Sequence, residues 1–184
     1  MTTLSLAHKL GMVPHHSYLR QLARQHGLVT EQDLIREAVA RGCFHFLQSD
    51  RPPEKSVSEE LFSNEQLALA MLTVANPYDP WLLRVGAMML SHPDNDAAEL
   101  ARYARYERSQ CVVRAIAEAG LKYEPHHEFW PRLLADLPQG VAPRNGVLPH
   151  HSRFVSIPGK TGPGTMGKPV WLRPARPASL GYAA

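Results

Sequence analysis

Cysteine is scarce in this chain of 184 residues. The two cysteines, Cys43 and Cys111, are far apart and show no C-x-x-C spacing. Disulfide frameworks and zinc ribbons use several cysteines at short, regular spacings, so neither is predicted here. We expect both thiols to stay reduced, which is their usual state in the cytoplasm, and we therefore expect a cytoplasmic protein.

Long apolar runs are also absent. The longest one is interrupted by Asn76, Pro77, Asp79 and Pro80. A membrane-spanning helix needs about 18 or more consecutive apolar residues. We therefore expect no membrane-spanning helix and no membrane partner.

The chain lacks recognisable motifs for catalysis or cofactor binding. Cys111 lies in an apolar stretch, where thiols are usually unreactive. Ser152 follows the His150-His151 pair without the glycine elbow that exposes a nucleophilic serine. No catalytic residue and no cofactor are predicted, and an enzyme whose site assembles only in three dimensions is the weaker alternative.

Histidine, by contrast, occurs ten times. Three doublets are present, at His15-His16, His126-His127 and His150-His151. Adjacent histidines on a helix point about 100° apart and cannot share one ion. No metal site is predicted. The alternative is a site assembled from distant segments, for which Cys43 and His45, which can point the same way on an extended segment, and the histidine doublets are the candidate ligands.

The middle of the chain predicts buried helices. Between Gln66 and Ser91 only Asp79 and Arg84 carry charge, so helices in this region must be covered on most sides.

Three helix starts are marked by capping patterns. Ser63 precedes Gln66 by three residues, as Asp96 precedes Glu99, and both pairs match a capping box. Asp79 followed by proline matches an N-cap with proline at the first helical position. We expect these helices to end near Asn76, near His92 and at Gly120, with a break in the last helix at residues 107–109.

Two shorter helices are predicted before this region. The first begins near Pro14 and stops at Gly27, and the second is capped by Thr30 and ends at Gly42. The acidic start of the second helix disfavours a DNA-reading helix-turn-helix.

The last 48 residues differ in composition from the rest. Residues 137–184 contain eight prolines, seven glycines, six basic residues and no acidic residue. Residues 1–136 contain 14 basic and 17 acidic residues, a formal charge of −3. Such a basic block commonly meets an acidic surface. Because residues 152–157 and 168–174 are rich in β-branched and aromatic side chains, they can pair as a short β-hairpin.

These patterns predict an all-α protein, a compact multi-helix bundle with an extended C-terminal arm. We expect an N-terminal helical pair at 1–49, a linker at 50–58, a helical core at 59–136 and the basic arm at 137–184. We also expect residues 154–157 and Trp171 to pack on the helical core, because the arm has too few apolar residues for a core of its own.

Two functional hypotheses of different classes follow. The first is a non-enzymatic module that binds another protein through the basic arm, with Lys160, Lys168, Trp171, Arg173 and Arg176 as contact residues and the four cations free to meet the partner. The second is binding of nucleic acid or another polyanion through the arm and an alternating stripe of arginines and tyrosines. The stripe consists of Arg102, Tyr103, Arg105, Tyr106 and Arg108, with Glu99 and Glu107 expected within pairing distance of its arginines.

Overall fold

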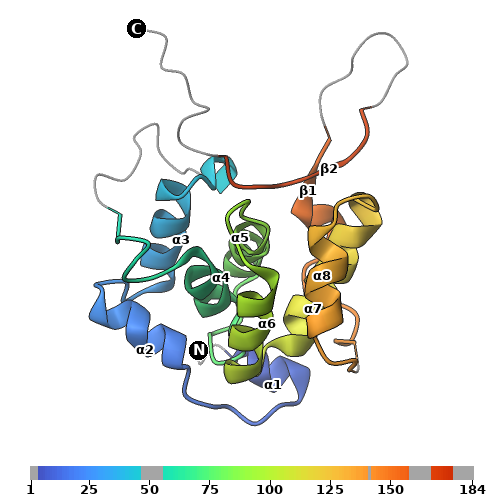
Figure 1. Cartoon of the computed structure of the whole chain (residues 1–184). Coiled ribbons are helices and arrows are strands. Elements are labelled where there is room, and N and C mark those ends of the chain that lie inside the picture. Colours follow the sequence, from blue (N-terminus) through green and yellow to red (C-terminus); the bar gives the residue numbers. More distant parts are fainter. Residues whose placement is uncertain (1–3, 47–55, 141, 158–166, 176–184) are drawn as a thin grey trace, which may run out of the picture.

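A computed structural model describes residues 4–46, 56–140, 142–157 and 167–175. Most of these residues are helical, and the sheet among them is a two-stranded antiparallel hairpin (Figure 1). The predicted all-α class with a C-terminal hairpin is confirmed. The α-helices are α1 (Leu6–Leu10), α2 (Tyr18–Gln25), α3 (Glu31–Ala40), α4 (Asn64–Leu72), α5 (Pro80–Leu90), α6 (Ala97–Tyr106), α7 (Gln110–Tyr123) and α8 (Phe129–Asp136). The shorter elements are the 3-10 helices η1 (Phe44–Phe46) and η2 (His151–Phe154) and the strands β1 (Val155–Ser156) and β2 (Val170–Trp171).

The predicted caps start three of the helices. The Ser63 hydroxyl accepts the N–H of Gln66 at 3.2 Å, and the Gln66 side chain accepts the N–H of Ser63 at 2.9 Å. Thr30 begins α3 with the same capping-box geometry. Asp79 caps α5, and Pro80 is its first residue. Local side-chain chemistry therefore fixes where these helices begin.

Helix α6 begins after Asp96, as predicted, but without the predicted capping box. The Asp96 carboxylate accepts the N–H of Glu99 at 2.9 Å. The N–H of Asp96 itself donates to Glu65 on α4 at 2.8 Å, and Glu99 pairs with Arg102. A tertiary hydrogen bond thus replaces the local one.

Helix α4 ends at Leu72 and not near Asn76. The reason is the side-chain amide of Asn76, which donates to the carbonyls of Ala70 and Met71 at 2.9 and 3.0 Å. Because the last carbonyls of a helix have no partner inside the helix, this amide closes the end of α4.

Gly120 does not end a helix, so that prediction is wrong. Helix α7 continues to Tyr123. A Cβ atom at position 120 would lie 2.4 Å from the ring of Trp130, which packs directly against the backbone of α7. The glycine therefore permits a close helix–helix contact. The predicted break before α7 is confirmed, since α6 stops at Tyr106.

Helix α4 lies at the centre of the bundle (Figure 1). Every residue from Leu67 to Leu72 is buried, and α4 packs against α2, α3, α5 and α6. The buried side chains of the described chain form one core, which includes Leu6 and Leu19 near the N-terminus and Trp171 in the arm. Most of the predicted linker falls within residues 47–55, outside the described residues.

The described part of the arm crosses the top of the bundle in Figure 1, from α7 and α8 towards η1. Val155 pairs with Trp171 in the hairpin, and the rings of Phe154 and Trp171 lie 5.6 Å apart. The predicted docking of the arm is confirmed for these two aromatics, which are buried, but Ile157 remains exposed. Farther along, the N–H of Ala175 donates to the carbonyl of Gly42 at 2.9 Å.

None of the helices in the described part of the chain has the length and apolarity needed to cross a membrane.

Candidate functional site

The predicted arginine stripe does not form one free cationic surface. Arg102 is in an ion pair with Glu99, and Arg105 donates to the carbonyl of Asp136 at 2.5 Å. Arg108 is exposed, and its side chain has no hydrogen-bond or ion-pair partner among the described residues. Of the three arginines, Arg108 is therefore the one available to a ligand.

The two tyrosines of the stripe and the acidic residue expected beside its arginines also lie in different environments. Tyr103 accepts a hydrogen bond from Gln66 at 3.1 Å, whereas Tyr106 is exposed. Glu107 was expected near the arginines, and that expectation is wrong. Its carboxylate is fully buried and accepts the N–H of Leu19 at 2.8 Å.

The five predicted contact residues of the arm lie in different environments. Lys160 and Arg176 fall outside the described residues. Lys168 is exposed, and Trp171 is buried with its indole N–H donating to the Ser91 hydroxyl at 3.1 Å. Trp171 therefore contributes to packing within the chain.

Arg173 is not free, contrary to expectation. Its guanidinium forms an ion pair with Glu124 and donates to the carbonyl of Ser91 at 3.0 Å. Glu124 also accepts the indole N–H of Trp130 at 2.7 Å. These bonds hold the arm against α7 and α8.

Arg108 occupies an unusual backbone position at the end of α6. The N–H of Ser109 donates to the carbonyl of Ala104 at 2.9 Å, and the N–H of Arg108 donates to that of Arg105 at 3.2 Å. This is the Schellman pattern, whose left-handed residue is usually glycine. Arg108 has φ of +52°, and the left-handed conformation costs a residue with a Cβ about 1–2 kcal/mol.

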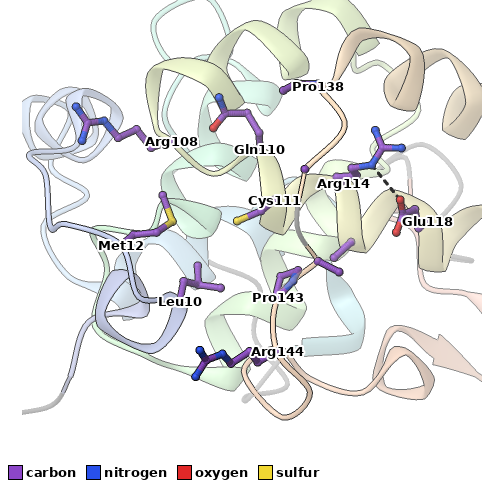
Figure 2. A pocket seen from close by; sticks show the side chains of 13 residues that line it. Leu10, Met12, Arg108, Gln110, Cys111, Arg114, Glu118, Pro138, Pro143 and Arg144 are labelled. Atoms are coloured by element: carbon purple, nitrogen blue, oxygen red, sulfur yellow. Dashed lines mark ion pairs between the residues drawn. The ribbon is translucent and has the colours of Figure 1, made fainter.

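A hollow of about 490 Å³ lies beside this residue, in the size range of small-molecule sites. Its walls come from α1 and the residue after Gly11, from α7 and its preceding turn, and from the first part of the arm (Figure 2). We call it the Arg108 pocket. Its apolar lining includes Leu10, Met12, Cys111, Ala115, Pro138, Ala142 and Pro143, and its polar lining includes Arg108, Gln110, Arg114, Glu118 and Arg144.

Positive charge surrounds the pocket. Figure 2 shows Arg108 and Arg144 at its edge, with guanidinium groups that reach outward from the central apolar side chains. Arg114 forms an ion pair with Glu118 at 3.0 Å, and Glu118 is the one acidic residue of the lining. The lining therefore carries a formal charge of +2. Both guanidiniums point away from the hollow in this structure, and exposed side chains change rotamer within nanoseconds.

The two thiols differ in access. Cys43 is fully buried, and Cys111 lines the Arg108 pocket in a half-buried position. Burial raises the pKa of both thiols, so neither is an activated nucleophile.

The histidine doublets do not form a metal site in the described part of the chain. Among these residues, no three His, Cys, Asp or Glu side chains lie close enough together to hold one metal ion. His150 accepts the N–H of Ser152 at 3.3 Å, and the Ser152 hydroxyl lies 2.8 Å from the same ring nitrogen. This is the local cap of η2, which explains the contact without catalysis.

Sequence reasoning found Arg108 but missed the rest of the pocket. Met12, Arg114 and Arg144 come from segments far apart in the sequence and share no motif. The feature of the sequence that points to this site is Arg108 itself, which stands between two predicted helices at a position where glycine is usual.

Comparisons with family models, curated proteins and solved structures found no match for this chain.

Proposed function

We propose that the protein binds a small organic anion in the Arg108 pocket, with the apolar body of the ligand against Met12 and Cys111 and its negative group at the arginines. The observation that carries this proposal is the left-handed conformation of Arg108. Glycine would relieve the strain, so a strained arginine at a pocket edge is best explained by a use for its side chain.

The lining supports a ligand of mixed character. Its apolar members suit an aromatic or branched aliphatic body, which is how most small-molecule sites obtain affinity. Arg108 and Arg144 have no acidic partner among the described residues, and guanidinium groups bind carboxylate or phosphate oxygens through two parallel hydrogen bonds. A neutral ligand would leave this charge unused.

The proposal predicts that Arg108→Gly weakens binding while it stabilises the protein. With 1-naphthoate as the probe, we expect affinity to fall about tenfold or more, since a hydrogen bond to a charged group contributes about 1.5–3 kcal/mol. We expect the free energy of unfolding to rise by about 0.5–1 kcal/mol as the strain is relieved. Calorimetric titration and denaturant unfolding measure the two effects.

Arg108→Ala is the matched control, because it removes the guanidinium and keeps a Cβ in the left-handed region. It should lose affinity as Arg108→Gly does, without the gain in stability. The uncharged 1-naphthamide should bind wild type and both variants about equally. Equal naphthoate affinity in wild type and both variants would refute the proposal.

A second candidate is binding of an acidic protein partner at the hairpin of the arm. Ile157 follows β1 and Val170 begins β2, so these two exposed large apolar residues lie at the loop end of the hairpin, and Lys168 is exposed close by. An apolar surface with a cation beside it suits a partner segment that carries both apolar and acidic side chains.

This candidate predicts that Lys168→Glu combined with Ile157→Ser abolishes co-purification of the partner. The fold should be unchanged, because both side chains are exposed. Arg132→Glu on α8, also highly exposed, serves as the charge-matched control and should leave co-purification intact. A partner that co-purifies equally with all three proteins does not bind at the hairpin.

A further inference from the structure

A second hollow, independent of the Arg108 pocket, lies between α2 and the segment after α4. It is about 180 Å³, and its lining is more polar than apolar. Its polar and charged lining residues include His15, His16, Arg20, Arg24, Glu31 and Asn76. We call it the Arg20 pocket.

Arg20 has a buried guanidinium group whose hydrogen bonds are only partly satisfied. Its side chain is 7% exposed, and its Nη2 donates to Glu31 at 3.0 Å and to the carbonyl of Val29 at 3.2 Å. Its Nη1 is shielded from solvent and has no hydrogen-bond partner among the described residues. A buried charged donor without an acceptor is unfavourable, and a bound ion is one of the few explanations for it.

Arg24 adds a second positive charge one helical turn farther along α2. It is exposed, and its side chain has no partner among the described residues. Burial lowers the pKa of the Arg20 guanidinium, and the nearby charge of Arg24 lowers it further, against the opposite effect of Glu31. Arg20, Arg24 and Glu31 thus give the lining of the hollow two guanidiniums and one carboxylate.

His15 provides further unused hydrogen-bonding capacity. Both of its ring nitrogens are buried and without partners among the described residues. Nε2 lies 3.8 Å from Oε2 of the buried Glu107, which is too long for a hydrogen bond. An imidazole ring carries at least one N–H, so His15 can donate to an acceptor in the hollow.

We infer that the Arg20 pocket binds a small free oxyanion, phosphate or sulfate. The unpartnered Nη1 of Arg20, the Arg24 guanidinium and His15 supply donors, and Glu31 is the one acidic side chain of the lining and already pairs with Arg20. A phosphate oxygen accepts hydrogen bonds from two guanidiniums readily. The volume of the hollow suits a tetrahedral anion and is far smaller than a site for a whole nucleotide.

The test is titration of inorganic phosphate into the full-length protein, followed by calorimetry and by the ring resonances of His15. We expect one saturable site, a shift of the His15 resonances, and loss of about tenfold or more in affinity for Arg24→Ala and Arg20→Gln. Arg24 is exposed, so its variant keeps the test valid if Arg20→Gln fails to fold. Arg36→Ala, which alters an exposed arginine of α3 outside the lining, is the control and should bind phosphate as wild type does.

Two results would overturn the inference. One is phosphate binding that is absent, or equal in wild type and Arg24→Ala. The other is tighter binding of AMP or phosphoserine than of phosphate, because the site would then recognise a phosphoryl group on a larger molecule. Arg24→Ala should bind 1-naphthoate as wild type does, because Arg24 lies outside the lining of the Arg108 pocket. Failure of phosphate binding at the Arg20 pocket can therefore be told apart from failure of naphthoate binding at the Arg108 pocket.

Discussion

Arg41→Met is expected to lower the free energy of unfolding by about 3–5 kcal/mol, the usual effect of breaking a buried ion pair by removing one partner. Arg41 and Glu37 are each 2% exposed in their side chains, and Nε of Arg41 lies 2.7 Å from Oε1 of Glu37. Arg41 also donates to Asn64 and to the carbonyl of Val57, both at 3.1 Å. Methionine replaces the apolar stem of the arginine but leaves the Glu37 carboxylate without a counter-ion inside the protein.

Denaturant unfolding at neutral pH measures this effect, and Arg36→Ala on α3, the helix that carries Glu37, is the matched control. Arg36 pairs with Asp33 at 3.2 Å in an exposed position, so its loss should change stability by less than about 1 kcal/mol. If Arg41→Met and Arg36→Ala destabilise the protein equally, the buried pair does not have the role assigned to it.

Trp171→Ala is expected to lower stability by about 3–5 kcal/mol, because it removes a large buried aromatic side chain. The Trp171 ring packs edge-on against Trp130, with ring centroids 5.0 Å apart, and the centroid of the Phe154 ring lies 5.6 Å from that of Trp171. Its loss should also weaken the attachment of the arm to α7, where the ion pair between Arg173 and Glu124 remains.

Two further substitutions show how much of the expected loss of stability comes from the packing of the Trp171 ring. Trp171→Phe keeps most of the apolar contact and loses the hydrogen bond to Ser91, so about 0.5–1.5 kcal/mol is expected. Val170→Ala changes the exposed neighbour on the same strand and should have little effect. Equal losses for Trp171→Ala and Val170→Ala in urea unfolding would contradict the docking of the arm.

The local features of the fold were predictable because their causes are local. Ser63 and Asp79 cap helices through atoms within three residues in the sequence, and the composition of the arm required its aromatics to dock. Helix α1 was not predicted. It is only five residues long, and its first N–H groups donate to the carbonyls of Asn76 and Val74, which are remote in the sequence.

Glu107 and Gly120 show why the rest could not be predicted. Helical spacing put Glu107 beside the arginines of the stripe, but the turn after α6 directs it to the N–H of Leu19. Gly120 has the sequence context of a C-cap, yet its role is set by the ring of Trp130. Both outcomes depend on tertiary contacts that no local pattern encodes. The two pockets were missed for the same reason, since each combines side chains from segments far apart in the sequence.

The central claim is that the Arg108 pocket holds an organic anion, and Cys111 offers a direct reporter of its occupancy. Cys111 lines the pocket, whereas Cys43 is fully buried and should not react in the folded protein. The measurement is the rate of Cys111 alkylation by iodoacetamide, at an alkaline pH because burial raises the pKa of this thiol. We predict that saturating 1-naphthoate slows alkylation in wild type, and that Arg108→Ala needs about tenfold or more naphthoate for the same protection. Alkylation at an unchanged rate in the presence of bound naphthoate would contradict the account.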